Sequence, residues 1–163
     1  VNDFFISPEP LIQKQFSRIM SLKDGTKKMS KSEISDLSRI NLTDDTDQIV
    51  NKIKKAKTDE YNIPSKIEEI ENRPEAKNLL GIYSSLSELT LENAIIKFSG
   101  KNFSEFKKVL TDVLIEKISP ISAEIKKLLK DKTYLDKILA EGSEKANDIS
   151  SKKVKKIHEI MGF

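Results

Sequence analysis

The chain has 163 residues, enough for one domain with a hydrophobic core or for two small lobes. Charged residues make up 34 % and aromatic residues only 6 %, a balance typical of helical proteins with a core of Ile and Leu. These residues include no Cys and no 18-residue apolar stretch, which excludes disulfide bonds, cysteine-based metal sites and a membrane-spanning helix among them. The net charge of +3 is compatible with a nucleic-acid partner without requiring one.

The first residues show no secretory-signal pattern and no initiator Met, so we expect either a removed Met or a piece of a longer protein. Pro8 and Pro10 predict an extended or turn-like beginning. The residues that follow, 16–22, carry apolar side chains at positions 16, 19, 20 and 22. This pattern predicts a short buried strand.

A cationic loop at residues 23–32 follows the predicted strand, with Gly25 expected to let the chain turn. The lysines at 28 and 31 alternate with the serines at 30 and 32. A mobile loop of this kind at the carboxyl end of a strand can hold polyphosphate, because Lys supplies positive charge while Ser and backbone N–H groups donate hydrogen bonds. In a lysine-rich chain the same composition is also typical of a solvated loop, and that alternative stays open at this point.

From about residue 43 onward the sequence predicts helices joined by short connections. The expected helical segments are one or two turns within 35–42, a helix capped by Thr43, one opened by Pro74, one from Thr90 to Gly100, one from Asn102 with a kink or break at Pro120, one from Thr133 to Gly142, and one over about 143–160. The helix after Pro74 is apolar around much of its circumference, so we expect it at the centre of its lobe. Polar residues 58–72 are expected to form a mobile connector.

Charges are unevenly placed on two of these segments. Asp44, Asp45 and Asp47 begin the helix after Thr43, and lysines crowd its end at 52–57. This order complements the helix dipole, which explains the acidic cluster more simply than a cation site does. The lysines at 52–57 form either a solvated face or a contact for RNA phosphate or for a closing active site. The last helix carries a second basic cluster at 152–156.

No Walker loop and no Gly-rich dinucleotide turn occurs, and the single histidine, His158, can form neither a triad nor a metal site alone. The stretch Lys28-Met29-Ser30-Lys31-Ser32, by contrast, resembles the ATP-binding loop of class I aminoacyl-tRNA synthetases. The whole chain is similar to the carboxyl-terminal half of the bacterial-type tryptophanyl-tRNA synthetase family. The matching stretches are 18–22, 27–32, 40–45, 52–59, 78–83, 141–146 and 161–163.

This resemblance implies a mainly α fold, in which residues 1–42 end a Rossmann-type catalytic domain and residues 43–163 form a helical lobe that binds the tRNA anticodon. The catalytic part would contribute its last strand, with the backbone near Ile19 facing adenine, and the ATP loop. The residues implied to bind ATP are Ile19, Lys28, Met29, Ser30, Lys31 and Ser32. The sequence assigns no residue to reading the anticodon.

The implied reaction ligates L-tryptophan to its tRNA through a tryptophanyl-adenylate, with Mg²⁺ carried by ATP, in a cytoplasmic homodimer with no membrane contact. When the amino-acid carboxylate attacks the α-phosphate, negative charge grows on the departing pyrophosphate. Lysines beside it stabilise the transition state more than the ground state, and a loop that closes excludes water. Lys28 and Lys31 are therefore the expected catalytic residues, with Ser30 and Ser32 orienting phosphate.

One departure limits the comparison. The family's other ATP motif, of the His-Ile-Gly-His type, cannot be present because the only histidine is His158. We therefore expect a carboxyl-terminal half that lacks the tryptophan pocket and is inactive alone. Two alternatives stay open: a free-standing helical tRNA-binding module that binds through 52–57 and 152–156 in a salt-sensitive way, and an inert helical interaction protein.

Overall fold

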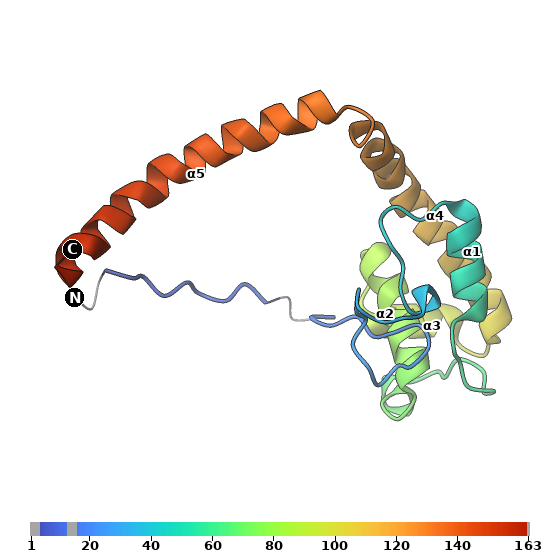
Figure 1. The fold of residues 1–163 in the computed structure, drawn as a ribbon. Coiled ribbons are helices and arrows are strands. Elements are labelled where there is room, and N and C mark those ends of the chain that lie inside the picture. The colour runs from blue at the N-terminus through green and yellow to red at the C-terminus, as the bar shows by residue number, and fades with distance from the viewer. Residues whose placement is uncertain (1–3, 13–15, 163) are drawn as a thin grey trace. The chain divides into compact units, whose positions relative to one another are not determined.

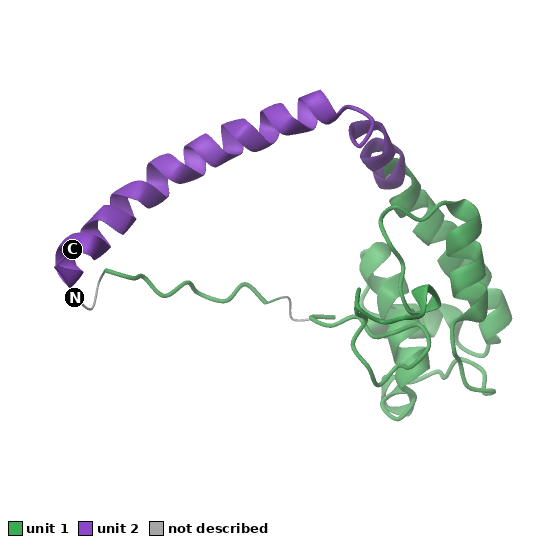
Figure 2. Cartoon of the chain, viewed as in Figure 1, with its two compact units in different colours: residues 1–120 green, residues 121–163 purple. Residues whose placement is uncertain are grey.

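The computed structural model describes residues 4–12 and 16–162, and these residues are mainly helical, as expected (Figure 1). The helices are α1 (Thr46–Lys55), α2 (Pro74–Leu86), α3 (Leu91–Phe98), α4 (Phe103–Leu128) and α5 (Lys132–Met161), with short 3-10 helices at Asp36–Ser38 and Ile67–Ile70. The chain divides into two compact units, residues 1–120 and residues 121–163 (Figure 2). The predicted division at residue 42 stays a prediction.

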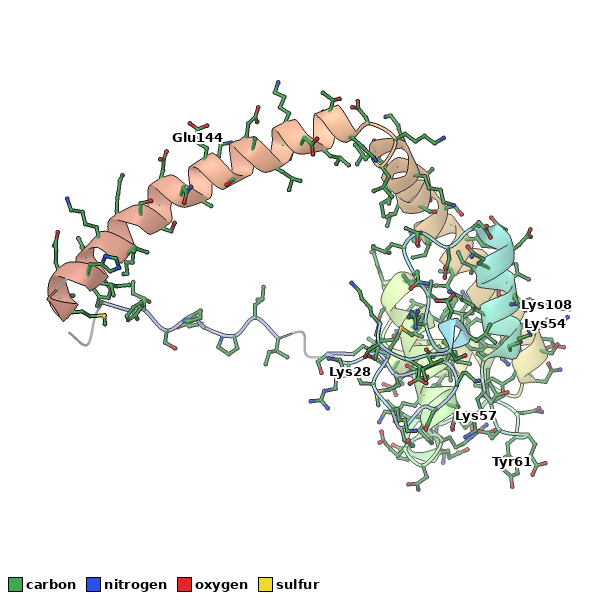
Figure 3. The ribbon with its side chains drawn as sticks, in the orientation of Figure 1. Lys28, Lys54, Lys57, Tyr61, Lys108 and Glu144 are labelled. Atoms are coloured by element: carbon green, nitrogen blue, oxygen red, sulfur yellow. The ribbon has the colours of Figure 1, made fainter. Side chains whose placement is uncertain are left out.

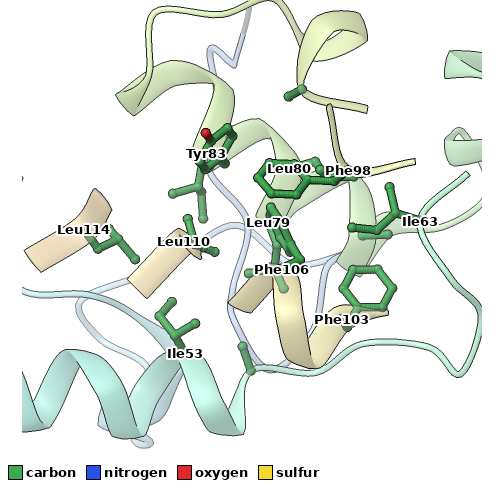
Figure 4. Packing of buried hydrophobic residues seen from close by; sticks show 14 of the residues in the cluster. Ile53, Ile63, Leu79, Leu80, Tyr83, Phe98, Phe103, Phe106, Leu110 and Leu114 are labelled. Carbon is green, nitrogen blue, oxygen red and sulfur yellow. The ribbon is translucent and has the colours of Figure 1, made fainter. Parts of the chain in front are cut away.

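The first unit has a hydrophobic core to which α1, α2, α3 and α4 all contribute (Figure 4). Helix α2 lies at its centre, as its apolar circumference predicts: Leu79, Leu80 and Tyr83 are each at most 2 % exposed. Aromatic rings are more important in this core than the composition suggests. Phe98 and Phe106 pack edge to face with centroids 4.8 Å apart, an arrangement that stabilises beyond simple burial.

The helix starts show which local signals are reliable. Pro74 occupies the first turn of α2, and the Thr90 side chain accepts a hydrogen bond from the Asn93 backbone at the start of α3, as predicted. The predicted cap at Thr43 is wrong, because α1 is capped by Asp45. The Asp45 side chain accepts from the Gln48 backbone and the Gln48 side chain accepts from the Asp45 backbone, each at 2.9 Å. This reciprocal pair satisfies two backbone donors, which Thr43 cannot do from two residues earlier.

The predicted helix boundaries at Thr133 and Gly142 are also wrong, and the kink or break predicted at Pro120 is not a break. Helix α4 continues through Pro120, although the boundary between the two units follows that residue. Helix α5 is continuous from Lys132 to Met161, is capped by Asp131 rather than Thr133, and passes through Gly142. A single Gly inside a helix costs about 1 kcal/mol, which weakens a long helix without ending it.

The predicted strand at residues 16–22 is reduced to one antiparallel bridge, between Met20 and Lys28. Hydrogen bonds from Met29 N to Ile19 O (3.0 Å) and from Ser21 N to Lys27 O (2.8 Å) flank the bridge. The other edge of this segment pairs with no strand among the described residues: Met20 bonds to the Asn78 side chain of α2, and Leu22 bonds to the backbone of Ser38 and Lys57. We refer to residues 19–29 as the loop hairpin.

The second unit consists of the end of α4 and helix α5. No residue of α5 is buried, and it exposes several large apolar side chains, such as Leu139 and Ile149. In the part of the chain that the structure describes, no helix is long and apolar enough to cross a membrane.

Candidate functional site

The loop hairpin turns tightly through residues 24–27 before it reaches the predicted phosphate loop. Asp24 organises this turn, because its carboxylate accepts hydrogen bonds from the Thr26 hydroxyl (2.6 Å) and the Thr26 backbone (3.1 Å). These bonds hold the pKa of Asp24 below its ordinary value. Gly25 lies in this turn, as predicted, and it is also buried: a Cβ there would lie 2.5 Å from the Glu75 nitrogen and from the Pro74 carbonyl carbon. The glycine therefore permits close approach to α2.

Residues 28–32 leave the hairpin on the exposed side of the chain (Figure 3, Lys28). The Ser30 and Ser32 hydroxyls are 2.8 Å apart, and the Ser30 hydroxyl also accepts a hydrogen bond from the Ser32 backbone. Met29 is half-buried and packs against the hydrophobic core. Met29 thus anchors a loop whose lysines and serines face solvent.

A hollow of about 310 Å³ opens beside this loop. It is lined by Ser17, Arg18, Ile19, Lys28, Met29, Ser30, Lys31, Arg39, Ile40 and Asn41. The lining therefore includes every predicted site residue except Ser32. It also brings together four cationic side chains and no carboxylate, which is an arrangement suited to a polyanion.

Two of these cations, Arg18 and Arg39, were missed as site residues. The sequence does offer a signal for Arg18, since this residue begins the first stretch that matches the family. Arg39 reaches the hollow because the chain folds back after the loop. Its guanidinium donates to the Glu33 carbonyl (2.9 Å) and the Asn41 side chain (3.2 Å), and pairs with Asp36 (3.0 Å). It thereby closes residues 33–41 into a compact turn, which no local pattern predicts.

A buried ion pair that includes a lysine of α1 contacts the turn at residues 33–41 and stabilises it. Lys52, on α1, is 3 % exposed, and its ammonium lies 2.6 Å from Asp44 and 2.7 Å from Asp36. Its hydrogen bond to Asp36 is the main reason that the pKa of Asp36 lies below the ordinary value. Asp44 also accepts a bond from the Asn41 backbone (2.9 Å). Lys52 therefore belongs neither to a solvated face nor to a contact for RNA phosphate or a closing active site, and the role of Asp44 is not purely dipolar.

Helix α2 holds the hairpin at three positions. Pro74 and Glu75 meet Gly25, and Asn78 bonds to the backbone of Met20. A Cβ on Gly81 would overlap the ring of Phe16. Positions 74, 78 and 81 lie on one face of a helix, so a single face of α2 contacts the segment that leads to the phosphate loop.

The connection from α1 to α2 adds an ion pair to this arrangement. Lys57 donates its backbone N–H to the Leu22 carbonyl (2.7 Å), and its ammonium lies 2.8 Å from Glu75. Each partner favours the charged form of the other: the pKa of Lys57 is raised and that of Glu75 is lowered. The hairpin is thus tied to both neighbouring helices.

A second hollow, of about 590 Å³, lies between α1 and α4 (Figure 3, Lys54 and Lys108). We call it the basic groove. It is lined by Val50, Lys54, Thr58, Phe103, Ser104, Lys107, Lys108, Thr111 and Asp112. Lys107 donates to the Ala56 carbonyl (2.6 Å) at the end of α1, and burial lowers its pKa. Lys54 and Lys108 are exposed and available to an anion.

No group of three or more His, Cys, Asp or Glu side chains is arranged to hold a metal ion within residues 4–12 and 16–162.

Comparison with known proteins places these observations in a family. The family model described as tRNA synthetases class I (W and Y) matches residues 1–119. A tryptophan–tRNA ligase of Agrobacterium fabrum is 48 % identical over 163 residues, which are 100 % of this chain and 46 % of that protein. One of Rickettsia conorii is 51 % identical over 156 residues, which are 96 % of this chain and 47 % of that protein.

Solved structures agree on the fold. The tryptophanyl-tRNA synthetase of Mycoplasma pneumoniae has a TM-score of 0.76 at 24 % identity, covering 93 % of this chain and 45 % of that one. That of Campylobacter jejuni, complexed with ADP and tryptophan, has a TM-score of 0.67 at 22 % identity, covering 99 % and 48 %. The chain spans about half the length of the curated relatives it matches. It therefore belongs to the tRNA synthetases of class I (W and Y), and it corresponds to the carboxyl-terminal half of the tryptophan ligases.

Proposed function

We propose that this chain is the carboxyl-terminal part of an enzyme that ligates L-tryptophan to its tRNA through a tryptophanyl-adenylate formed from ATP. The observation that carries the proposal is the hollow beside residues 28–32, whose lining contains four cationic side chains and no carboxylate. The identity of 48 % to a tryptophan–tRNA ligase over the whole chain supports tryptophan as the amino acid. By the family resemblance, the enzyme acts in the cytoplasm as a homodimer.

In this proposal the loop receives the phosphates of ATP. Lys28 and Lys31 neutralise the charge that grows on the departing pyrophosphate, and Ser30 and Ser32 donate hydrogen bonds that orient it. The backbone at Ile19 and Met29 contacts adenine, and Arg18 and Arg39 add positive charge at the edge of the hollow. Mg²⁺ enters on the phosphates of ATP.

The tryptophan pocket and the second ATP motif are assigned to the half of the relatives that this chain does not span. In this proposal the chain supplies the cationic loop that binds the phosphates, while the complementary half supplies the tryptophan pocket and the rest of the nucleotide site. Closure of residues 28–32 over the bound ATP would exclude water at the moment of attack.

The test is tryptophan-dependent ATP–pyrophosphate exchange by this chain, alone and mixed with the amino-terminal half of the Agrobacterium fabrum ligase. We expect activity in the mixture only. Replacing Lys28 or Lys31 with Ala should lower the exchange rate about a hundredfold, as for other transition-state donors. Lys23→Ala is the matched control, because Lys23 is an exposed lysine of the same segment that does not line the hollow.

Exchange by the chain alone would overturn the assignment of the tryptophan pocket to the other half. An equal loss for Lys23→Ala would show that general positive charge matters rather than the two positions. Absence of exchange activity in the wild-type mixture, with tRNA binding intact, would favour a second function.

That second function is tRNA binding without catalysis, and the basic groove favours it. Lys54 and Lys108 are exposed lysines that line this hollow of about 590 Å³, and their ammonium groups can bind phosphates of a nucleic-acid backbone. Binding should weaken linearly on a plot of log affinity against log salt. Replacing both lysines with Ala should reduce the slope by about 1 to 2, because each phosphate contact contributes about 0.9. An unchanged slope would exclude the groove as the tRNA contact.

A further inference from the structure

We propose that Asn78 is a positioning residue for residues 28–32, because its side chain replaces the missing neighbouring strand of the loop hairpin. This inference rests on the proposed function, in which the loop receives the phosphates of ATP. It concerns a residue on α2 that does not line the hollow.

The pairing of the hairpin leaves one edge of Met20 open. Met20 and Lys28 face each other across an antiparallel bridge, and the hydrogen bonds on either side of it join Ile19 with Met29 and Ser21 with Lys27. In this register the facing residues exchange no hydrogen bonds with each other. The N–H and C=O of Met20 therefore point away from Lys28, to the edge where a third strand would pair.

Asn78 occupies that edge. Its Oδ1 accepts a hydrogen bond from Met20 N at 2.9 Å, and its Nδ2 donates to Met20 O at 2.8 Å. A carboxamide carries one acceptor and a donor in one plane, as a peptide group does, so it satisfies both edge groups of a single residue. Asn78 is 7 % exposed, and the two residues are 58 positions apart, so water has little access and the contact is tertiary.

The neighbouring contacts on α2 hold the hairpin close to the helix, and the hydrogen bonds of Asn78 orient the hairpin backbone at Met20. Phe16 meets the helix at position 81 by packing, and Gly25 meets it at positions 74–75 by packing and by a backbone hydrogen bond to the Glu75 carboxylate. The two hydrogen bonds of Asn78 fix how the backbone of Met20 is turned. Because Lys28 lies opposite Met20, the same bonds fix where the phosphate loop begins.

A small displacement here has a large expected effect, since a misplacement of about 1 Å can cost about a hundredfold in rate. The basic groove lies between α1 and α4 and contains no residue of the hairpin. Loss of Asn78 should therefore impair chemistry on ATP and leave tRNA binding unchanged. A general loss of structure would impair both.

Amide hydrogen exchange on this chain tests the inference without any activity. Asn78→Leu removes both hydrogen bonds and keeps an apolar body in the site. Exchange should accelerate at least tenfold at the amide of Met20, which bonds to Asn78, and also at the amides of Ser21 and Met29, which bond to Lys27 and Ile19 across the hairpin. Asn78 also donates a longer bond of 3.5 Å to the Ser21 carbonyl, so Met29 is the amide whose residue makes no hydrogen bond to Asn78. The amide of Leu110, in the core, should keep its wild-type rate. Acceleration at Met20 alone, or an equal acceleration at Leu110, would overturn the proposal.

Ser84→Ala is the matched control, because Ser84 is also buried on α2 and its hydroxyl has no hydrogen-bond partner among the described residues. It should leave all four amides unchanged. In the mixture with the amino-terminal half, Asn78→Leu should lower kcat of the exchange reaction at least tenfold, with an unchanged KM for tryptophan and unchanged tRNA affinity. A wild-type rate in Asn78→Leu would also overturn the proposal.

Asn78→Asp adds a pH readout. A protonated carboxyl group offers the same donor and acceptor as the carboxamide, whereas a carboxylate only accepts and faces the Met20 carbonyl. The rate of Asn78→Asp relative to wild type should therefore rise as the pH falls, and a flat ratio would contradict the proposed pairing. If the wild-type mixture is inactive in ATP–pyrophosphate exchange, the proposed function fails. The hydrogen-exchange pattern of the amides still decides whether Asn78 positions the loop.

Discussion

Lys52 and Asp44 form a buried ion pair, each side chain 3 % exposed, with Nζ of the lysine 2.6 Å from Oδ2 of the aspartate. Replacing Lys52 with Met leaves a buried carboxylate without its partner. The expected cost is about 3–5 kcal/mol of unfolding free energy, measured by urea denaturation. Lys54→Met, an exposed position one residue past Ile53 on the same helix, should change stability by less than about 0.5 kcal/mol. Equal effects of the two changes would mean that the pair does not support the fold.

Asp59 and Arg73 should make stability sensitive to acid. The guanidinium contacts the carboxylate twice, at 2.6 and 2.9 Å. Burial alone would raise the pKa of Asp59, but the bonds from Arg73 hold it below the ordinary value of 3.8. The folded state therefore binds this proton less readily than the unfolded state, so the contribution is complete above the unfolded pKa and is lost as the pH falls through the folded one.

Urea unfolding of the wild type and Asp59→Asn at several values between pH 7 and pH 2.5 measures this contribution. Asp59→Asn should be less stable by about 1–3 kcal/mol at pH 7, because it loses a charged hydrogen-bond partner. The difference between the two proteins should shrink as the pH drops below about 4. If the difference in unfolding free energy between the two proteins did not change with pH, the charge of the Asp59 carboxylate would not be the source of the stabilisation.

The start of α1 offers a direct comparison of two candidate caps. Asp45→Ala removes the acceptor for the Gln48 backbone and should lower stability by about 1 kcal/mol. Thr43→Ala lies outside the capping box and should change stability by less than about 0.5 kcal/mol. Thermal unfolding of the two variants checks the order, and the reverse order would restore Thr43 as the cap.

Two glycines in helices should respond to Ala in opposite directions. Gly81→Ala places a methyl group against the ring of Phe16, and overpacking of this kind costs about 1–3 kcal/mol. Gly142→Ala meets no described atom within 4 Å, and it should stabilise α5 by about 0.5–1 kcal/mol through helix propensity alone. Circular dichroism during thermal unfolding measures both effects. A stabilising Gly81→Ala would indicate that Phe16 does not rest on α2.

The features that sequence predicted well are those that depend on neighbours along the chain. Pro74, Thr90 and Asn102 each mark a helix start through groups three residues away or fewer, and all three were correct. The apolar circumference of α2 also placed it at the core. Residues 28–32 were identified by their order, and the hollow lined by Lys28 and Lys31 is consistent with an anion site. Their action on ATP stays a prediction.

The features that sequence missed depend on residues far away in the chain. Lys52 has the composition of a surface lysine and is buried because Asp36 and Asp44 fold over it. Arg39 enters the hollow only after residues 33–41 turn back. The apolar residues at 16–22 suggested a strand, but the pairing edge of Met20 is used by a side chain of α2. Periodicity carries no signal for such pairings.

The face of α2 at positions 74, 78 and 81 has a consequence for dividing this protein into pieces. A peptide ending at residue 42 would contain all of Lys28-Met29-Ser30-Lys31-Ser32, yet it would lose Pro74, Asn78 and Gly81 together. The loop of this peptide would have its complete sequence but would lack the face of α2 that positions it. An ordered loop therefore requires at least the residues through the end of α2 at Leu86, and truncations or chimeras should be joined beyond that residue.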